Sequence, residues 1–260
     1  GETTSLDVGA QTVTLANDAT QALKGGEIML AATDTVTLKA GSAIEAEGAG
    51  GDAGDYTANG NGAFVRAAST VAGFSRTGSP DRSAGALVGE AGSTVQASAA
   101  IVLDATRDNA FRGSARFERN GASVAGDLAV GATRINFGAA PAGVSGLTYG
   151  QAELDALDLA GLTLTSYSGF DLYGDVTVGR LDAGGKPVLQ NLSLQGAGLA
   201  GIDNAGATAR INAGNLALSN PDSASTFAPG GSPGTGALEI NADTLTLGAG
   251  DKRIGGFGAV

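Results

Sequence analysis

The stretch RINAGNLALS at residues 210–219 recurs almost unchanged as EINADTLTLG at residues 239–248. In the first copy, apolar side chains twice stand two positions apart. The two pairs are Ile211 with Ala213 and Leu216 with Leu218. Because side chains two positions apart share one face of a β-strand, each pair predicts a short strand with one apolar face.

The two pairs would be out of phase in a straight strand. The step from Ala213 to Leu216 is odd, so the leucines would face away from Ile211. A bend at Gly214–Asn215 removes this conflict, because Gly and Asn adopt turn conformations at low cost. We predict two short strands that meet at a corner, with all four apolar side chains inward. The second copy predicts the same corner at Asp243–Thr244.

Other segments repeat parts of this pattern. They are Glu27–Leu38, Leu157–Leu164, Arg134–Asn136 and Asn191–Leu194. Strand pairs with corners that recur at short intervals are typical of a solenoid, in which stacked coils bury each other's side chains. Sustained helical spacing of apolar residues is absent, although residues 152–157 could form one helical turn. The sequence therefore predicts an all-β fold.

The composition fits a narrow core of small and branched side chains. The 260 residues include 44 Gly, 5% aromatic residues and no Trp. We predict a single β-helical domain over residues 1–260, with loop excursions near residues 48–85, 106–121 and 220–236. Because residue 1 is Gly rather than Met, we expect a processed form or a fragment of a larger chain.

Charge and residue usage exclude several classes of function. A net charge of −11 argues against nucleic acid as a partner, since phosphate neutralisation needs clustered Lys and Arg. No apolar run approaches the roughly 18 residues of a membrane-spanning helix. Cys and His are both absent, which removes disulfides, thiolates and the commonest general base and metal ligand. We predict no catalytic residue, no cofactor and no metal site.

Three phrases carry a resemblance to a known family. They are EIMLAATDTVTLKAGSAIEAEG at residues 27–48, RINAGNLALSN at residues 210–220 and GALEINADTLTLGAG at residues 236–250. They resemble the passenger regions of filamentous haemagglutinin-type large exoproteins, which Gram-negative bacteria export by two-partner secretion. Autotransporter passengers use a similar repeat pattern, so the sequence leaves the export route open.

The resemblance implies a right-handed parallel β-helix that is secreted or exposed on the bacterial surface. It implies export through an outer-membrane transporter and a virulence role in adhesion. The partners would be a host-cell receptor or glycan, or a neighbouring bacterial surface. The family's secretion domain carries Asn-Pro-Asn-type motifs, and this chain has only Asn-Pro-Asp at residues 220–222. The chain is therefore similar to a non-catalytic shaft segment.

The stretch ATRDNAFRGSARFERN at residues 106–120 is the candidate contact region. In an acidic chain it concentrates arginines and phenylalanines, which are enriched at binding hot spots and suit acidic glycans. The candidate residues are Arg107, Phe111, Arg112, Arg116, Phe117 and Arg119. A second interpretation is structural: the phenylalanines cover the side of the solenoid and the arginines pair with its carboxylates.

Two other functions stay open. A polysaccharide-active β-helix enzyme would align acidic residues of successive coils beneath a cleft. Candidate carboxylate pairs are Glu45/Glu47, Asp52/Asp55, Asp155/Asp158 and Asp171/Asp175. Such positions are more often solvated turns and outward strand positions. A self-associating matrix module would instead expose an uncapped coil, whose free edge would pair with a neighbour.

Overall fold

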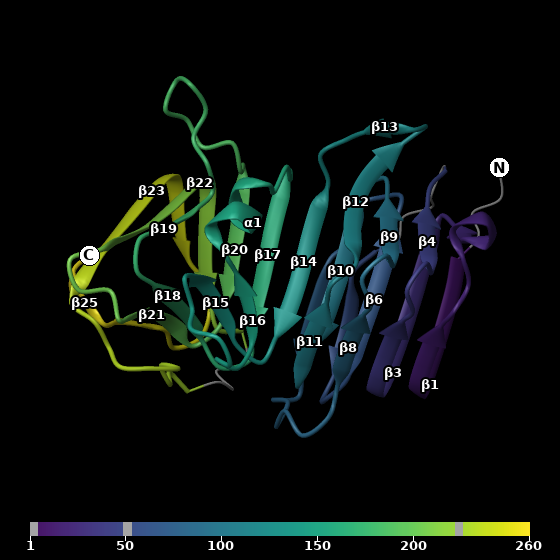
Figure 1. Ribbon diagram of the computed structural model, residues 1–260, viewed down its shortest axis with the longest axis horizontal. Helices are drawn as coiled ribbons and strands as arrows, with labels where there is room; N and C mark the ends of the chain where they lie inside the picture. The colour runs from purple at the N-terminus through teal and green to yellow at the C-terminus, as the bar shows by residue number, and fades with distance from the viewer. Residues whose placement is uncertain (1–4, 49–53, 222–225) are drawn as a thin grey trace. The chain divides into compact units, whose positions relative to one another are not determined.

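The computed structural model describes residues 5–48, 54–221 and 226–260 (Figure 1). Strands make up 56% of the chain and helix 3%, and many of the strands pair in parallel, which confirms the predicted all-β class. The chain divides into two compact units, Gly1–Gly131 and Ala132–Val260.

Unit 1 contains a main sheet, a second sheet and a small third sheet. The main sheet has the order β11-β8-β3-β6-β10-β14, and β1 also pairs with β3. Its strands are β1 (Ser5–Leu15), β3 (Glu27–Leu38), β6 (Ala63–Ala68), β8 (Ala86–Gly89), β10 (Ala100–Ala105), β11 (Asp108–Phe111) and β14 (Asp127–Ala132). The second sheet has the order β13-β12-β9-β4-β2. Its strands are β2 (Leu23–Gly25), β4 (Ala43–Ala46), β9 (Thr94–Ala97), β12 (Ser114–Arg119) and β13 (Ala122–Ser123).

The expected excursion at residues 48–85 is only partly a departure from the main sheet. Within it, β5 (Tyr56–Asn59) and β7 (Phe74–Thr77) form their own two-stranded parallel sheet. However, β6 is a core strand that pairs antiparallel with both β3 and β10. All of its residues are buried. One face of β6 lies in the core of unit 1, and β5 and β7 cover the other face. Residues 49–53 lie outside the described chain.

The expected loop at residues 106–121 was wrong. Strand β11 pairs in parallel with β8, and β12 pairs in parallel with β9. The stretch therefore contributes two regular strands to the sheets of unit 1, and in β12 Phe117 is buried while Arg116 is exposed. The many charged residues of this stretch made its alternating strand pattern hard to recognise from the sequence. By contrast, the described parts of residues 220–235 contain no strand beyond an isolated bridge at Pro233, as predicted for a loop.

Unit 2 stacks the two copies of the repeated phrase directly on each other. Its larger ladder runs β17-β20-β22-β23-β25, and β19 also pairs with β22. These strands are β17 (Gly161–Ser166), β19 (Val176–Val178), β20 (Asn191–Gln195), β22 (Thr208–Ser219), β23 (Gly236–Leu247) and β25 (Phe257–Ala259). Between β22 and β23, Ile211 lies beside Ile240 and Leu216 lies beside Leu245, in parallel register.

The burial predicted for the first copy is confirmed, but β22 runs unbroken from Thr208 to Ser219, so two separate short strands are not seen. Ile211, Ala213, Leu216 and Leu218 are all buried, although they do not keep one alternating phase. Gly214 lies between the two pairs, at the odd step, and a Cβ atom there would lie only 2.9 Å from the carbonyl oxygen of Gln190. In the second copy the outcome differs, because Leu245 is 49% exposed and Leu247 is 68% exposed.

A second ladder completes unit 2, in the order β16-β15-β18-β21-β24. Its strands are β15 (Ile135–Gly138), β16 (Leu147–Tyr149), β18 (Phe170–Tyr173), β21 (Gly198–Ile202) and β24 (Arg253–Gly255). Phe137 and Phe170 stack in the interior with ring centroids 6.1 Å apart. One helix, α1 (Gln151–Asp155), forms at the turn that the sequence only weakly suggested, and Glu153 accepts a hydrogen bond from the Gly150 N–H at its start.

Candidate functional site

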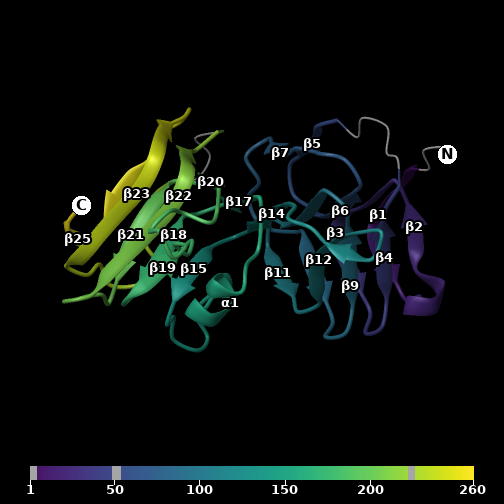
Figure 2. The ribbon, with the colours of Figure 1, turned by 90° about the horizontal axis from the view of Figure 1, so that it is seen from above.

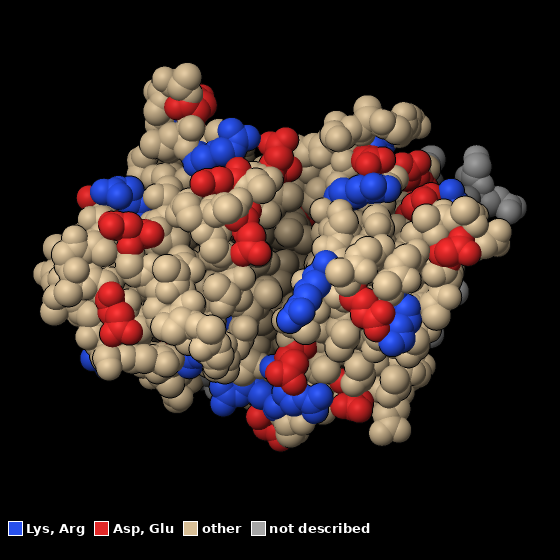
Figure 3. Space-filling view, viewed as in Figure 1, with Lys and Arg blue, Asp and Glu red and all other residues tan. Residues whose placement is uncertain are grey.

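The six candidate contact residues lie along one turn of unit 1. Arg107 precedes β11, Phe111 ends it, Arg112 follows it, and Arg116, Phe117 and Arg119 belong to β12. The structure brings them into one continuous segment but does not gather their charges into one patch. Figure 3 shows basic and acidic side chains close to one another on the visible face of unit 1, with wide uncharged areas between them.

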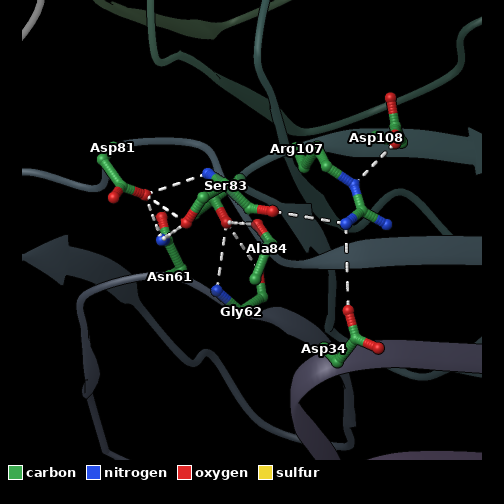
Figure 4. Close-up of polar contacts among 9 residues, drawn as sticks. Asp34, Asn61, Gly62, Asp81, Ser83, Ala84, Arg107 and Asp108 are labelled. Atoms are coloured by element: carbon green, nitrogen blue, oxygen red, sulfur yellow. Dashed lines mark hydrogen bonds and ion pairs between the residues drawn. The ribbon is translucent and has the colours of Figure 1, made fainter.

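Arg107 is held by its surroundings (Figure 4). Its guanidinium lies 2.9 Å from the Asp108 carboxylate and 3.9 Å from that of Asp34, on β3. It also donates to the carbonyl oxygen of Ser83 at 3.3 Å. These contacts join the turn before β11 to two earlier segments of the chain. They match the structural interpretation of this arginine.

The neighbouring loop is fixed by a second carboxylate. Asp81 accepts hydrogen bonds from the amide of Asn61 and from the backbone N–H and hydroxyl of Ser83 (Figure 4). The Ser83 hydroxyl and the Asn61 amide lower the pKa of Asp81 to about 2. The carboxylate is therefore ionised at neutral pH, and its hydrogen bonds hold the loop around Ser83 in place.

Arg116 and Arg119 are also occupied. The guanidinium of Arg116 donates to Gln96 at 2.9 Å and lies 3.2 Å from the carboxylate of Glu118. Arg119 donates to the carbonyl oxygen of Ser98 at 3.4 Å. Both side chains reach from β12 to neighbouring strands, so part of their hydrogen-bonding capacity is already used.

The two phenylalanines pack against neighbouring backbone of unit 1. Phe117 is buried and packs over Gly126, while the half-buried ring of Phe111 lies over Gly89. At both glycines even a Cβ atom would collide with the ring. Neither ring stands free on the surface as an exposed hot spot would. Here the structural interpretation fits better than the binding one.

Arg112 is different. It lies exposed in the short turn between β11 and β12, and its backbone N–H is bonded to Gly89. Within the described residues its guanidinium makes no hydrogen bond and no ion pair. It is therefore the candidate arginine with all its donors available to a partner.

Sequence reasoning missed three buried arginines that hold neighbouring segments of the chain together. Arg76 of β7 pairs with Asp104 of β10, with both side chains almost completely buried, and it donates to the carbonyl oxygen of Gly60 at 2.9 Å. Arg66 of β6 pairs with Glu27 and donates to the carbonyl oxygens of Gly54 and Gly73. These two arginines join the β5–β7 sheet to the main sheet of unit 1.

The third buried arginine fixes a loop of unit 2. Arg134 lies 2.8 Å from the carboxylate of Asp171 and donates to the carbonyl oxygen of Ala228 at 2.6 Å. The backbone N–H of Gly230 donates to the same carboxylate oxygen. Burial raises the pKa of Asp171, although the charge of Arg134 opposes the shift.

The candidate carboxylate pairs have structural contacts. Glu45 pairs with Lys24, Glu47 accepts from Gln96, Asp55 from Gly73, Asp155 from Gln151, and Asp175 from Thr208, while Asp158 pairs with Arg180 and Asp171 with Arg134. Asp52 lies outside the described residues. Over residues 5–48, 54–221 and 226–260, no three acidic side chains gather as metal ligands would.

Comparisons of the chain with protein-family models, with curated proteins and with solved structures gave no match. Among the described residues, no helix has the length and apolar character needed to cross a membrane.

Proposed function

We propose that this chain is a non-catalytic segment of a secreted bacterial surface adhesin and that it is built as a right-handed parallel β-helix. In this proposal the coils form a shaft that presents contact residues to host cells or to other bacteria. Export would use an outer-membrane transporter. The partner would be a receptor or an acidic glycan.

In-register stacking supports the β-helical part of this proposal. In unit 2, β17, β20, β22 and β23 are successive parallel neighbours, and the second ladder repeats this with β15, β18 and β21. A chain that returns to the same ladders turn after turn is typical of a repeat scaffold whose neighbouring turns stack on one another. The engaged carboxylates are consistent with a scaffold that has no acid–base chemistry.

The observation that carries the adhesive part is the uncommitted guanidinium of Arg112. An exposed arginine with all its donors available can bind a carboxylate or sulfate in bidentate geometry. In a chain of net charge −11, such a group offers a local attraction for an acidic partner. Arg107 and Arg116 would add little, because their guanidinium groups already pair with carboxylates.

We expect the labelled chain to bind host cells or immobilised sulfated glycans saturably, and Arg112→Ala to weaken this binding about tenfold or more. The measurement is equilibrium binding to cells and to a glycan panel at two salt concentrations. Arg180→Ala is the matched control, because Arg180 is similarly exposed but pairs with Asp158. Equal binding by wild type and Arg112→Ala would contradict the role of Arg112, and no binding by either would contradict the adhesive role.

Self-association is a second candidate function, favoured by the exposed leucines of β23. Strand β23 pairs with β22 along both halves, but β25 pairs with it only at Gly236 and Ala237. Leu245 and Leu247 are thereby left on a strand half with one unpaired edge within the described chain. An open edge with exposed leucines is a surface on which a second copy could add a strand.

If this surface joins two copies, the chain should form concentration-dependent oligomers that Leu245→Lys/Leu247→Lys abolishes, because the charges oppose burial. Sedimentation equilibrium measures the effect. Val71→Lys is the control, since Val71 is 72% exposed in the other unit. A wild-type chain that stays monomeric at high concentration would exclude this function for the segment.

A further inference from the structure

A groove in unit 1 lies between the edge of the β1–β3 pair and the β5 strand. It encloses about 610 Å³, which is in the range of ligand-binding sites. Its lining includes Ala10 of β1, Ala32 and Thr33 of β3, Phe64 of β6, and Tyr56 and Asn59 of β5. Figure 2 shows β5 and β7 above β3 and β6. The groove belongs to neither the contact turn at Arg112 nor the edge of β23.

The groove has a rigid aromatic wall. Tyr56 stacks on Phe64 with ring centroids 4.9 Å apart and an interplanar angle of 11°. Phe64 in turn stacks with Phe74 at 4.9 Å. Because Phe64 belongs to the fully buried strand β6, the stack is anchored in the core. The aromatic surface is therefore preorganised, which lowers the entropic cost of binding a flat ligand.

Polar groups with no partner stand beside the aromatic wall. Within the described residues, the hydroxyls of Thr33 and Tyr56 and the amide of Asn59 make no hydrogen bonds. The nearby amide of Asn61 differs, because it is committed to Asp81 and Ser83. An amide and two hydroxyls together offer both donors and acceptors at the rim of the groove.

The groove presents no unpaired charge to a ligand. Arg76 is the one charged residue that lines it in the described chain, and its guanidinium is bonded to Asp104 and to the carbonyl oxygen of Gly60. An anionic ligand would find no free cation there, and a cationic ligand would find no carboxylate. The chemistry favours a neutral ligand with one apolar face and a polar rim.

We propose that this groove binds a neutral sugar unit of a glycan. A pyranose ring presents C–H groups on its flat face, which would lie against the partly exposed ring of Tyr56, while the buried ring of Phe64 supports Tyr56 from behind. Its hydroxyls would exchange hydrogen bonds with Asn59 and Thr33. This site does not depend on the adhesive role of Arg112, which concerns acidic partners at a different turn.

The test titrates the whole chain with neutral oligomers of glucose, galactose and N-acetylglucosamine, followed by NMR. We expect at least one oligomer to bind saturably, with a dissociation constant that does not change with salt. Asn59→Ala and Tyr56→Phe should each weaken that binding roughly three- to tenfold without changing the melting temperature. Tyr56→Phe keeps the ring stack, so any weakening of sugar binding in this variant reports the contribution of the hydroxyl alone.

Two controls make the result specific. Asn241→Ala removes an exposed strand amide in unit 2 and should leave sugar binding unchanged. Arg112→Ala should also leave it unchanged, which separates this site from the adhesive proposal. The inference is overturned if none of the neutral oligomers binds, or if Asn59→Ala and Tyr56→Phe bind as tightly as the Asn241→Ala control.

Discussion

Replacing Leu216 by Ala should lower the free energy of unfolding of unit 2 by about 2–5 kcal/mol. Leu216 is 1% exposed and lies between β20 and β23, beside Leu192 on one side and Leu245 on the other. Truncation leaves a cavity that stacked parallel strands cannot close, because their hydrogen-bonded spacing is fixed. Denaturant unfolding, followed by a probe placed in unit 2, measures the loss.

Leu245→Ala is the matched control for this experiment. It makes the same substitution at the equivalent position of the repeated phrase, where the side chain is 49% exposed. We expect a loss of less than about 1 kcal/mol. Equal losses at the two positions would mean that Leu245 is covered in solution, either by a second copy or by a rearranged end of β23. Such a result would contradict the burial described for unit 2 and would favour self-association.

Replacing Arg76 by Met should destabilise unit 1 by about 3–5 kcal/mol. The substitution leaves the buried carboxylate of Asp104 without its guanidinium, in surroundings where an uncompensated charge is costly. It also removes the bond to Gly60 that holds the turn after β5. Denaturant unfolding measures the global effect, and limited proteolysis of residues 54–78 shows whether the β5–β7 sheet detaches.

Two further variants separate the buried pair from general disruption. Arg76→Met/Asp104→Leu removes both charges and should recover most of the lost stability, because a buried ion pair can often be replaced by apolar residues. Arg210→Met breaks the exposed pair with Glu239 and should cost less than about 1 kcal/mol. If the double variant is no more stable than Arg76→Met, the buried charge of Asp104 is not the cause.

Local sequence determined the all-β class and the phrase-level structure. The step between Ala213 and Leu216 predicts a change of phase because side-chain alternation in a strand is strict, and burial on both sides of Gly214 bears this out. The similarity of the two phrases anticipated their stacking, since like side chains fit above like side chains at the strand spacing. The alternation depends only on neighbours in the chain, and the stacking depends on the likeness of two distant phrases.

Other features depended on the tertiary structure. Strand β6 reads as a glycine-flanked interruption, and it becomes a core strand only because β5 and β7 cover its second face. The charged stretch at residues 106–121 reads as a loop, yet its pairing with β8 and β9 makes two regular strands of it. In both cases long-range pairing outweighs local composition.

The candidate site shows the same division. The sequence indicated a cluster of arginines, but only their partners distinguish the committed Arg107 from the uncommitted Arg112. The groove beside Tyr56 is formed by segments distant in the chain, and the buried pair of Arg76 with Asp104 joins two strands. A sequence fixes which groups are present and how they alternate. Which groups are neutralised, covered or left available is decided by contacts between distant segments, because burial and charge pairing are properties of the folded chain.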